Sequence, residues 1–264
     1  MGLNKRQGID NKKSKDEDNT MNIECINEEN DFQQVTFDFL EPDEKFYHNL
    51  KQLLRKTFCF VNWAFEGVLQ SICDQKDFGI FLGVEDDDNP EENMIYAVLT
   101  ILNLKKLNEV GFLPQFRDFI IGHCEEQVVH FLENTIFSDY PSIGLLINER
   151  VLNLPYVVVP SIYQQLMEDK RFLEEEADAT DEEKAAFMFK FLIYFTVGVY
   201  RKEDDQVKDF GINNMNFAKT EDEHFIKKAV VLQKIPSPLG EEYALLFMIL
   251  KYEDFIDFSY KCVA

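Results

Sequence analysis

The sequence has little of what catalysis or phosphate binding requires. It contains four histidines, and none of them stands at a zinc-site spacing from another histidine or from a pair of cysteines. It lacks the G-x-S-x-G motif, the P-loop and the G-x-G-x-x-G turn, so no stretch supplies the glycine-rich backbone that holds phosphate groups. We therefore expect no catalytic residue, no metal site and no cofactor.

Long apolar runs are also missing. The first twenty residues hold no apolar stretch of the kind found in a secretory signal. The longest apolar run, Phe191–Tyr200, is too short to span a bilayer. The five cysteines are scattered and include no C-x-x-C pair, which favours reduced thiols over a disulfide framework. These absences indicate a soluble intracellular protein.

What the chain has in excess is negative charge. Its 49 acidic and 27 basic residues give a net charge of -22, which repels nucleic acid and the anionic face of a membrane but attracts basic proteins. Beyond the N-terminal segment, acids gather between residues 85 and 92 and between residues 174 and 183. Such clusters usually form solvated loops. They are also candidates for binding a basic partner, through Glu85, Asp86, Asp87, Asp88, Glu174, Glu175 and Glu176.

The N-terminal segment changes sign along its length. Residues 1–15 carry five basic residues and one acid, whereas residues 16–44 carry eleven acids and no base. Residues 1–31 contain no aromatic residue and are rich in polar ones, so we expect a disordered charged tail there and a single domain over residues 32–264. The two basic stretches are typical of a nuclear import signal, formed by Lys5, Arg6, Lys12, Lys13 and Lys15.

The spacing of apolar residues predicts a mixed α/β fold. Strands are predicted near residues 35–39, 78–85, 95–104, 142–148, 187–199, 225–234 and 243–252. Apolar residues at helical spacing predict helices near 46–54, 63–73, 116–120 and 128–136, and another that begins near 160. This order indicates one mixed sheet of about seven strands flanked by helices, an α/β or α+β domain.

The stretch from residue 142 to residue 160 joins a strand to a helix start. Its strand is apolar on both faces, as a central strand is, and ends in Asn148, Glu149 and Arg150. Prolines at 155 and 160 prevent the chain from continuing in the ladder. The three polar residues form either an ion pair with an amide cap at the strand end or a surface that binds a partner.

Several segments resemble one family. GLLINERVLNLP at 144–155 and VVVPSIYQQLMED at 157–169, with VTFDFLEP, VLTILNL and FKFLIYFTVGVYR, resemble the BCCIP family of conserved eukaryotic nuclear proteins. The resemblance runs from about residue 35 to residue 255, and the chain differs from the family in its shorter acidic tail. The positions that match the most specific motif are Gly144, Leu145, Leu146, Asn148, Glu149, Arg150, Asn153, Leu154 and Pro155.

This resemblance implies a fold like that of the GCN5-related acetyltransferases, without the working parts of the enzyme. It also implies a nuclear protein, able to shuttle to the cytoplasm, that escorts basic client proteins. The chief client implied is a basic ribosomal protein of the large subunit, which links the chain to nuclear export and ribosome biogenesis. The alternative that the resemblance carries is a scaffold for cell-cycle regulators such as a kinase inhibitor.

An acetyltransferase is the alternative from another class. In that superfamily the acetyl-CoA pyrophosphate sits on a glycine-rich turn that opens a helix, where free backbone N–H groups meet the phosphates. The corresponding residues here read VLNLPYVVVP, and Pro155 and Pro160 have no N–H group to offer. We therefore expect a non-enzymatic protein.

Overall fold

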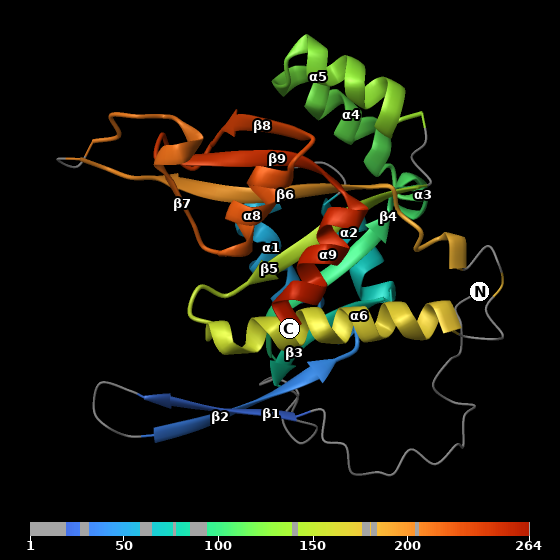
Figure 1. Cartoon of the computed structure of the whole chain (residues 1–264), viewed down its shortest axis with the longest axis vertical. Helices are drawn as coiled ribbons and strands as arrows, with labels where there is room; N and C mark the ends of the chain where they lie inside the picture. The colour runs from blue at the N-terminus through green and yellow to red at the C-terminus, as the bar shows by residue number, and fades with distance from the viewer. Residues whose placement is uncertain are drawn as a thin grey trace.

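A nine-stranded sheet is the framework of the fold (Figure 1). A computed structural model describes residues 20–26, 32–58, 65–75, 78–84, 94–138, 142–175, 180, 184–203 and 206–263. The strand order is β1-β2-β3-β4-β5-β6-β9-β8, and β7 pairs with β6. Among the described strands, β5 and β6 form the one parallel pair. The strands are β1 (Thr20–Ile26), β2 (Phe32–Leu40), β3 (Gly79–Val84), β4 (Met94–Asn103), β5 (Ile143–Arg150), β6 (Phe191–Tyr200), β7 (Met215–Phe217), β8 (Val231–Pro236) and β9 (Tyr243–Lys251).

Helices cover both faces of this sheet. Figure 1 shows α6, α8 and α9 in front of it and α1 and α2 behind it. The front helices are α6 (Val159–Glu175), α8 (Glu221–Lys228) and α9 (Tyr252–Val263). The other helices are α1 (Tyr47–Phe58), α2 (Phe65–Asp74), α3 (Leu104–Glu109), α4 (Phe112–His123) and α5 (Glu126–Phe131), which a π-helical turn extends over Leu132–Ile136. Short 3-10 turns occupy Glu44–Phe46, Tyr156–Val158 and Ile212–Asn214. Within the described ranges, no helix has the length and apolar character to cross a membrane.

Strand β5 contributes to a core on each face of the sheet. Leu145 and Ile147 pack into the core beneath α1 and α2, while Leu146 packs into the core beneath α6 and α9. This alternation follows from the two-residue repeat of a strand. The glycine at 144 is required by close approach, because a Cβ atom there would lie 2.4 Å from Cγ2 of Ile101 on β4. The prediction of a buried central strand that starts near residue 142 is therefore confirmed.

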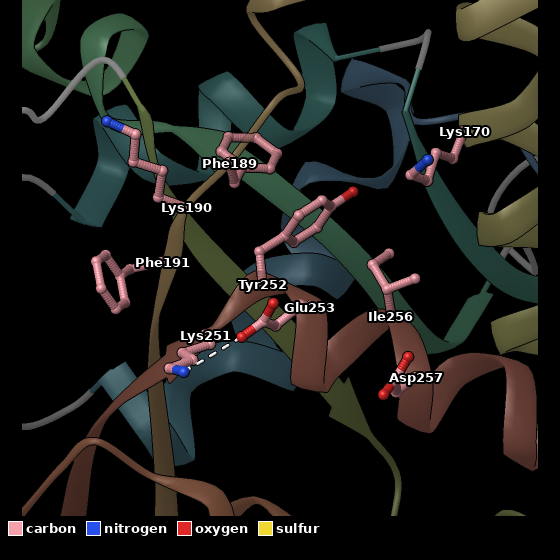
Figure 2. A pocket seen from close by; sticks show the side chains of 9 residues that line it. All are labelled: Lys170, Phe189, Lys190, Phe191, Lys251, Tyr252, Glu253, Ile256 and Asp257. Atoms are coloured by element: carbon pink, nitrogen blue, oxygen red, sulfur yellow. Dashed lines mark hydrogen bonds and ion pairs between the residues drawn. The ribbon is translucent and has the colours of Figure 1, made fainter.

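Helix α9 closes the fold at its C-terminal end. It follows β9 directly, and its residue Phe255 is fully buried in the core beneath α6 and α9. Its first turn borders a cavity at the start of β6 and the end of β9, drawn in Figure 2.

The predicted mixed fold is confirmed, and the sheet is mostly antiparallel. Three predicted segments differ from the structure. Residues 225–228 form the end of α8 rather than a strand, and residues 252–263 form α9. Residues 187–190 precede β6, which begins at Phe191. Two adjacent apolar residues, as at 225 and 226, fit a strand or a helix equally well, so the local pattern did not decide between them.

The predicted disordered tail also differs from the structure. Thr20–Ile26 form β1, which pairs along its whole length with β2. Polar composition concealed a strand pattern, since Met21, Ile23 and Cys25 alternate with more polar residues. The other residues of that tail, 1–19 and 27–31, lie outside the described part of the chain.

Candidate functional site

The parallel strands β5 and β6 separate halfway along their length. Their pairing runs from Ile143 opposite Phe191 to Leu146 opposite Tyr194. Beyond these residues β5 pairs only with β4, and β6 pairs with β9 and β7. A buried backbone group that loses its strand partner needs another hydrogen bond. The polar end of β5 therefore faces a gap that other residues must fill.

Lys219, between β7 and α8, fills this gap. Its side chain is 5% exposed, and Nζ donates to the backbone oxygen of Asn148 at 2.8 Å and to Oε1 of Glu149 at 3.0 Å. The same ammonium lies 5.4 Å from the ring centroid of Tyr194. Burial lowers the pKa of Lys219, but the charges of Glu149 and Asp222 raise it by more, so its pKa lies above the ordinary value. Lys219 is therefore a buried cation at neutral pH.

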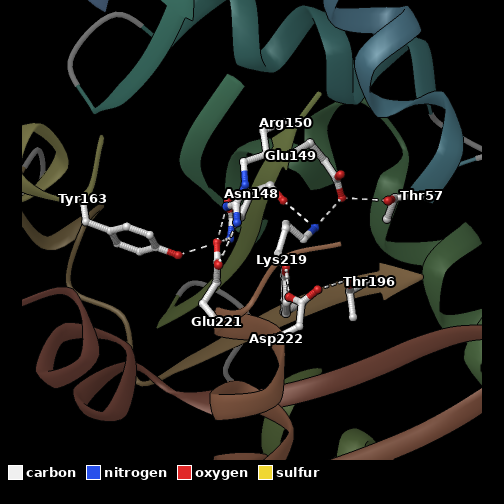
Figure 3. Close-up of polar contacts among 10 residues, drawn as sticks. Thr57, Asn148, Glu149, Arg150, Tyr163, Thr196, Lys219, Glu221 and Asp222 are labelled. Carbon is white, nitrogen blue, oxygen red and sulfur yellow. Dashed lines mark hydrogen bonds and ion pairs between the residues drawn. The ribbon is translucent and has the colours of Figure 1, made fainter. Parts of the chain in front are cut away.

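Glu149 connects this cation to the helix behind the sheet. Its Oε1 accepts a hydrogen bond from Oγ1 of Thr57 on α1 at 2.7 Å, as well as the one from Lys219 (Figure 3). Alternation along β5 turns Glu149 toward the α1 side and its two neighbours toward the α6 side. Lys219 thus joins groups that belong to both faces of the sheet.

Arg150 and Glu221 form a second ion pair, on the α6 side. Both guanidinium Nη atoms donate to the carboxylate, and the Nη2 to Oε2 distance is 2.9 Å. Asn148 Nδ2 donates to Oε1 of Glu221 at 3.1 Å and to the hydroxyl oxygen of Tyr163 at 3.2 Å. Burial raises the pKa of Glu221, but its bonds with Arg150 lower it by more, so the pKa lies below the ordinary value. The pair is ionised and bidentate, which is the strongest hydrogen-bonding geometry for a guanidinium and a carboxylate.

Asp222 is the most deeply buried member of the cluster. It is fully buried, and its two oxygens accept hydrogen bonds of 2.6 Å from Tyr194 Oη and from Thr196 Oγ1. Burial raises the pKa of Asp222 to about 6, a shift that the nearby Lys219 charge opposes. This carboxyl group can therefore change its charge near neutral pH. We call Asn148, Glu149, Arg150, Lys219, Glu221 and Asp222 the buried network.

The structure brings together some of the predicted site residues. Asn148, Glu149 and Arg150 all join the buried network, which corresponds to the ion-pair interpretation of the strand end. Arg150 pairs with Glu221, seventy-one residues away, rather than with its neighbour Glu149. Glu174 and Glu175 lie apart from it, exposed at the end of α6. The other predicted residues lie outside the described ranges: Glu85, Asp86, Asp87, Asp88, Glu176, Lys5, Arg6, Lys12, Lys13 and Lys15.

Sequence reasoning missed the half of the buried network that comes from residues 219–222. No element is predicted between the strands near 187–199 and 225–234, yet this stretch contains β7 and the start of α8. The available signal was three acids in succession, Glu221, Asp222 and Glu223, which are typical of the first turn of a helix. That signal locates a helix but does not show that two of the acids are buried.

Breaking the Arg150–Glu221 pair is expected to destabilise the fold. Arg150→Ala leaves the Glu221 side chain, 2% exposed, without its countercharge, which should lower the free energy of unfolding by about 3–5 kcal/mol. Urea denaturation measures this. The matched control is Arg117→Ala, which breaks an exposed pair with Glu133 and should cost less than about 1 kcal/mol. An Arg150→Ala protein that unfolds normally but no longer binds its partner would favour the partner-binding interpretation instead.

The raised pKa of Asp222 predicts a pH-dependent contribution to stability. An unperturbed aspartate titrates at 3.8, so between about pH 4 and pH 6 the folded protein holds a proton that the unfolded chain has released. Stability contributed by Asp222 therefore falls as pH rises through this window, by about 3 kcal/mol. Asp222→Asn should remove that decline in urea denaturation from pH 4.5 to pH 7. Parallel pH profiles for the two proteins would contradict the assignment.

Comparison with known proteins gives one consistent family. A family model described as BCCIP matches residues 32–230. The "Protein BCCIP homolog" of Arabidopsis thaliana is 26% identical over 199 residues, which cover 74% of this chain and 60% of that protein. The "BRCA2 and CDKN1A-interacting protein" of Mus musculus is 22% identical over 208 residues, covering 75% of this chain and 65% of that protein. The chain thus spans about 60% of the length of the first of these relatives.

A solved structure shares the fold. The crystal structure of BCP1 from Saccharomyces cerevisiae superimposes with a TM-score of 0.60 at 19% identity, covering 86% of this chain and 87% of that one. This identity supports the fold alone. The family match, in contrast, extends over most of the chain and includes all six residues of the buried network. The protein belongs to the BCCIP family.

Proposed function

We propose that this chain is a non-enzymatic nuclear protein that binds and escorts basic client proteins. The observation that carries the proposal is the net charge of -22. The buried pairs Arg150–Glu221 and Lys219–Glu149 each contain one cation and one acid, so they leave this acidic excess to the rest of the chain. Acidic surfaces attract basic proteins and accelerate their association.

The exposed acids at the end of α6 support this proposal. Glu174 and Glu175 occupy the last turn of the helix, which contains no basic residue. Acidic side chains are unfavourable at a helix C-terminus because they meet the negative end of the helix dipole. Glu174 pairs with Lys170 one turn earlier in the helix, which accounts for that acid, so the exposed Glu175 is the one that supports binding to a basic surface.

The client class that we propose is a basic ribosomal protein of the large subunit, as the family resemblance implies. Escort of such a protein would place the chain in ribosome biogenesis and nuclear export. The second candidate function is a scaffold for cell-cycle regulators. It is supported by the name of the mouse relative, "BRCA2 and CDKN1A-interacting protein", and it is compatible with the first.

The acetyltransferase alternative is less well supported. In the connection from β5 to α6, the N–H of Leu154 donates to the oxygen of Val151 and that of Val158 to the oxygen of Pro155. These N–H groups are used within the turn instead of pointing at a phosphate site. Lys219 occupies the gap where β5 and β6 separate. A side chain of the protein therefore already fills that space.

Client binding should depend on salt and on the acidic clusters. A basic ribosomal protein should bind the immobilised chain at low salt and be released at high salt, because the Debye length is about 8 Å at physiological ionic strength. Replacing Asp86, Asp87 and Asp88 by Asn should weaken binding about tenfold. The matched control replaces three exposed acids elsewhere, Glu109, Asp118 and Glu241, by their amides. Binding that ignores salt, or that weakens equally in both variants, would refute the proposed surface.

Nuclear location should depend on the basic residues at the start of the chain. Deleting residues 1–15 should move the protein to the cytoplasm, as seen by fluorescence microscopy, without changing its melting temperature. Stability should not change because the described strand pairing begins at Thr20, after the deleted residues. A control with Arg in place of the four lysines keeps the charge and should remain nuclear. A deletion variant that stays nuclear would exclude this import signal.

A further inference from the structure

Strands β1 and β2 form a hairpin at one end of the sheet. They pair over seven residues, from Thr20 opposite Asp38 to Ile26 opposite Phe32. Among the described residues, only the last three of β2, Asp38–Leu40, pair with β3. Figure 1 shows this hairpin in blue at the bottom of the view. Two strands without a third are marginally stable in water, so the outer part of the hairpin would gain stability from an added strand.

The base of the hairpin is fixed to the core of the protein. Phe37 on β2 is 5% exposed and packs into the core beneath α6 and α9. Its ring meets the ring of Tyr96 on β4 edge to face, with 5.4 Å between the centroids. Leu40 packs into the core beneath α1 and α2. Strand β2, with which β1 pairs along its whole length, is therefore anchored on both faces of the sheet.

The two end strands of the sheet differ in how their edges are protected. At one end, β8 carries Lys234 and finishes with Pro236, and lysine and proline on an edge strand hinder pairing with another chain. At the other end, β1 contains neither residue type, and its register with β2 is regular throughout. No described strand pairs with its outer edge. A regular edge of this kind is a template for a strand of another protein.

The charge around β1 selects the kind of strand that can bind there. Residues 16–44 hold eleven acids and no base. The pairing of Asp38 with Gly83 places the end of β3 beside β2, and the acidic stretch at 85–92 begins directly after Val84. A second copy of this chain would bring an equally acidic edge, and like charges repel each other. The occupant that fits is a basic segment of another protein.

The two faces of the hairpin specify a pattern for that segment. Residues directly opposite each other in an antiparallel pair share a face, and successive residues of a strand alternate between the faces. Met21 and Ile23 therefore fall on the face of Phe37, whereas Glu24 falls on the face of Asp38. An added strand alternates in the same way. A segment in which apolar residues alternate with lysine or arginine would match both faces.

We propose that the outer edge of β1 binds an extended basic segment of the client protein as an additional strand. Backbone hydrogen bonds to β1 hold the segment, and its basic residues lie on the face of Glu24 and Asp38. In this mode of recognition main-chain hydrogen bonds supply affinity and alternate side chains supply specificity. The inference rests on the proposed escort function and deepens it, because it names the surface and the conformation of the bound client segment.

N-methylated peptides test whether the backbone edge is used. The probe is a short labelled peptide of alternating lysine and valine, and fluorescence anisotropy follows its binding to the full chain. Two further peptides carry N-methyl groups on every lysine or on every valine, which removes alternate N–H groups without changing the charge. Because alternate N–H groups point to opposite edges of a strand, one methylated peptide should bind about tenfold more weakly and the other nearly as tightly as the probe.

Glu24→Lys tests the location of the bound strand. It reverses the one charge within β1 and should weaken binding of the probe about fivefold. The matched control, Glu109→Lys, makes the same change at an exposed residue of α3 and should leave affinity nearly unchanged. Backbone hydrogen exchange within Thr20–Ile26 should slow about tenfold when the probe binds, whereas exchange within β8 should stay the same.

The proposal is overturned if both methylated peptides bind as tightly as the probe, because charge alone would then explain the association. It is also overturned if both lose binding equally, if the two lysine variants bind alike, or if exchange slows at β8 instead of β1. A chain that binds the basic ribosomal protein but not the peptide loses this surface and keeps the escort function. A chain that binds neither loses both.

Discussion

The ammonium of Lys219, buried between β5 and β6, is the contact on which the two halves of the sheet depend. Direct pairing of these strands covers only four residue pairs, from Ile143 to Leu146 on β5. Past that point the backbone oxygen of Asn148 is supported by Lys219 instead of by a strand. Burying a charge costs several kcal/mol, so such a contact persists only when hydrogen bonds and countercharges surround it. Glu149 and the ring of Tyr194 provide these surroundings.

The need for hydrogen bonds and countercharges around Lys219 explains why several charged residues lie together in the middle of an apolar fold. Once Lys219 lies in the gap, Glu149 must face it, and Thr57 then fixes Glu149 from α1. The same segment carries Glu221 and Asp222 into the front layer, where Arg150 and the hydroxyls of β6 satisfy them. A partly satisfied polar network is worse than an apolar core. Each member therefore constrains the position of the next, and α8 is held against the sheet as a consequence.

The buried network does not alter the overall charge balance of the molecule. Arg150 pairs with Glu221 and Lys219 with Glu149, one cation with one acid in each pair, so the acidic excess is carried by the other residues of the chain. Long-range attraction depends on that exposed excess rather than on any single pair.

The sequence by itself determined the mixed fold, most of the strands and the polar end of β5. Strands such as β4, β5 and β9 are apolar on both faces, and helices such as α1 and α4 show a clear apolar stripe, so their local pattern was sufficient. The sequence also determined the acidic excess, since net charge does not depend on folding. The family resemblance rested on contiguous motifs and was therefore visible without a structure.

Only the tertiary structure decided what the polar residues of β5 contact. The partner of Arg150 lies seventy-one residues further along the chain, and no periodicity relates two positions so far apart. Burial of Lys219 and Asp222 was equally hidden, because charged residues in a polar stretch are usually exposed. Local preferences act over a few residues, whereas the buried network exists only because the packed sheet brings distant segments together.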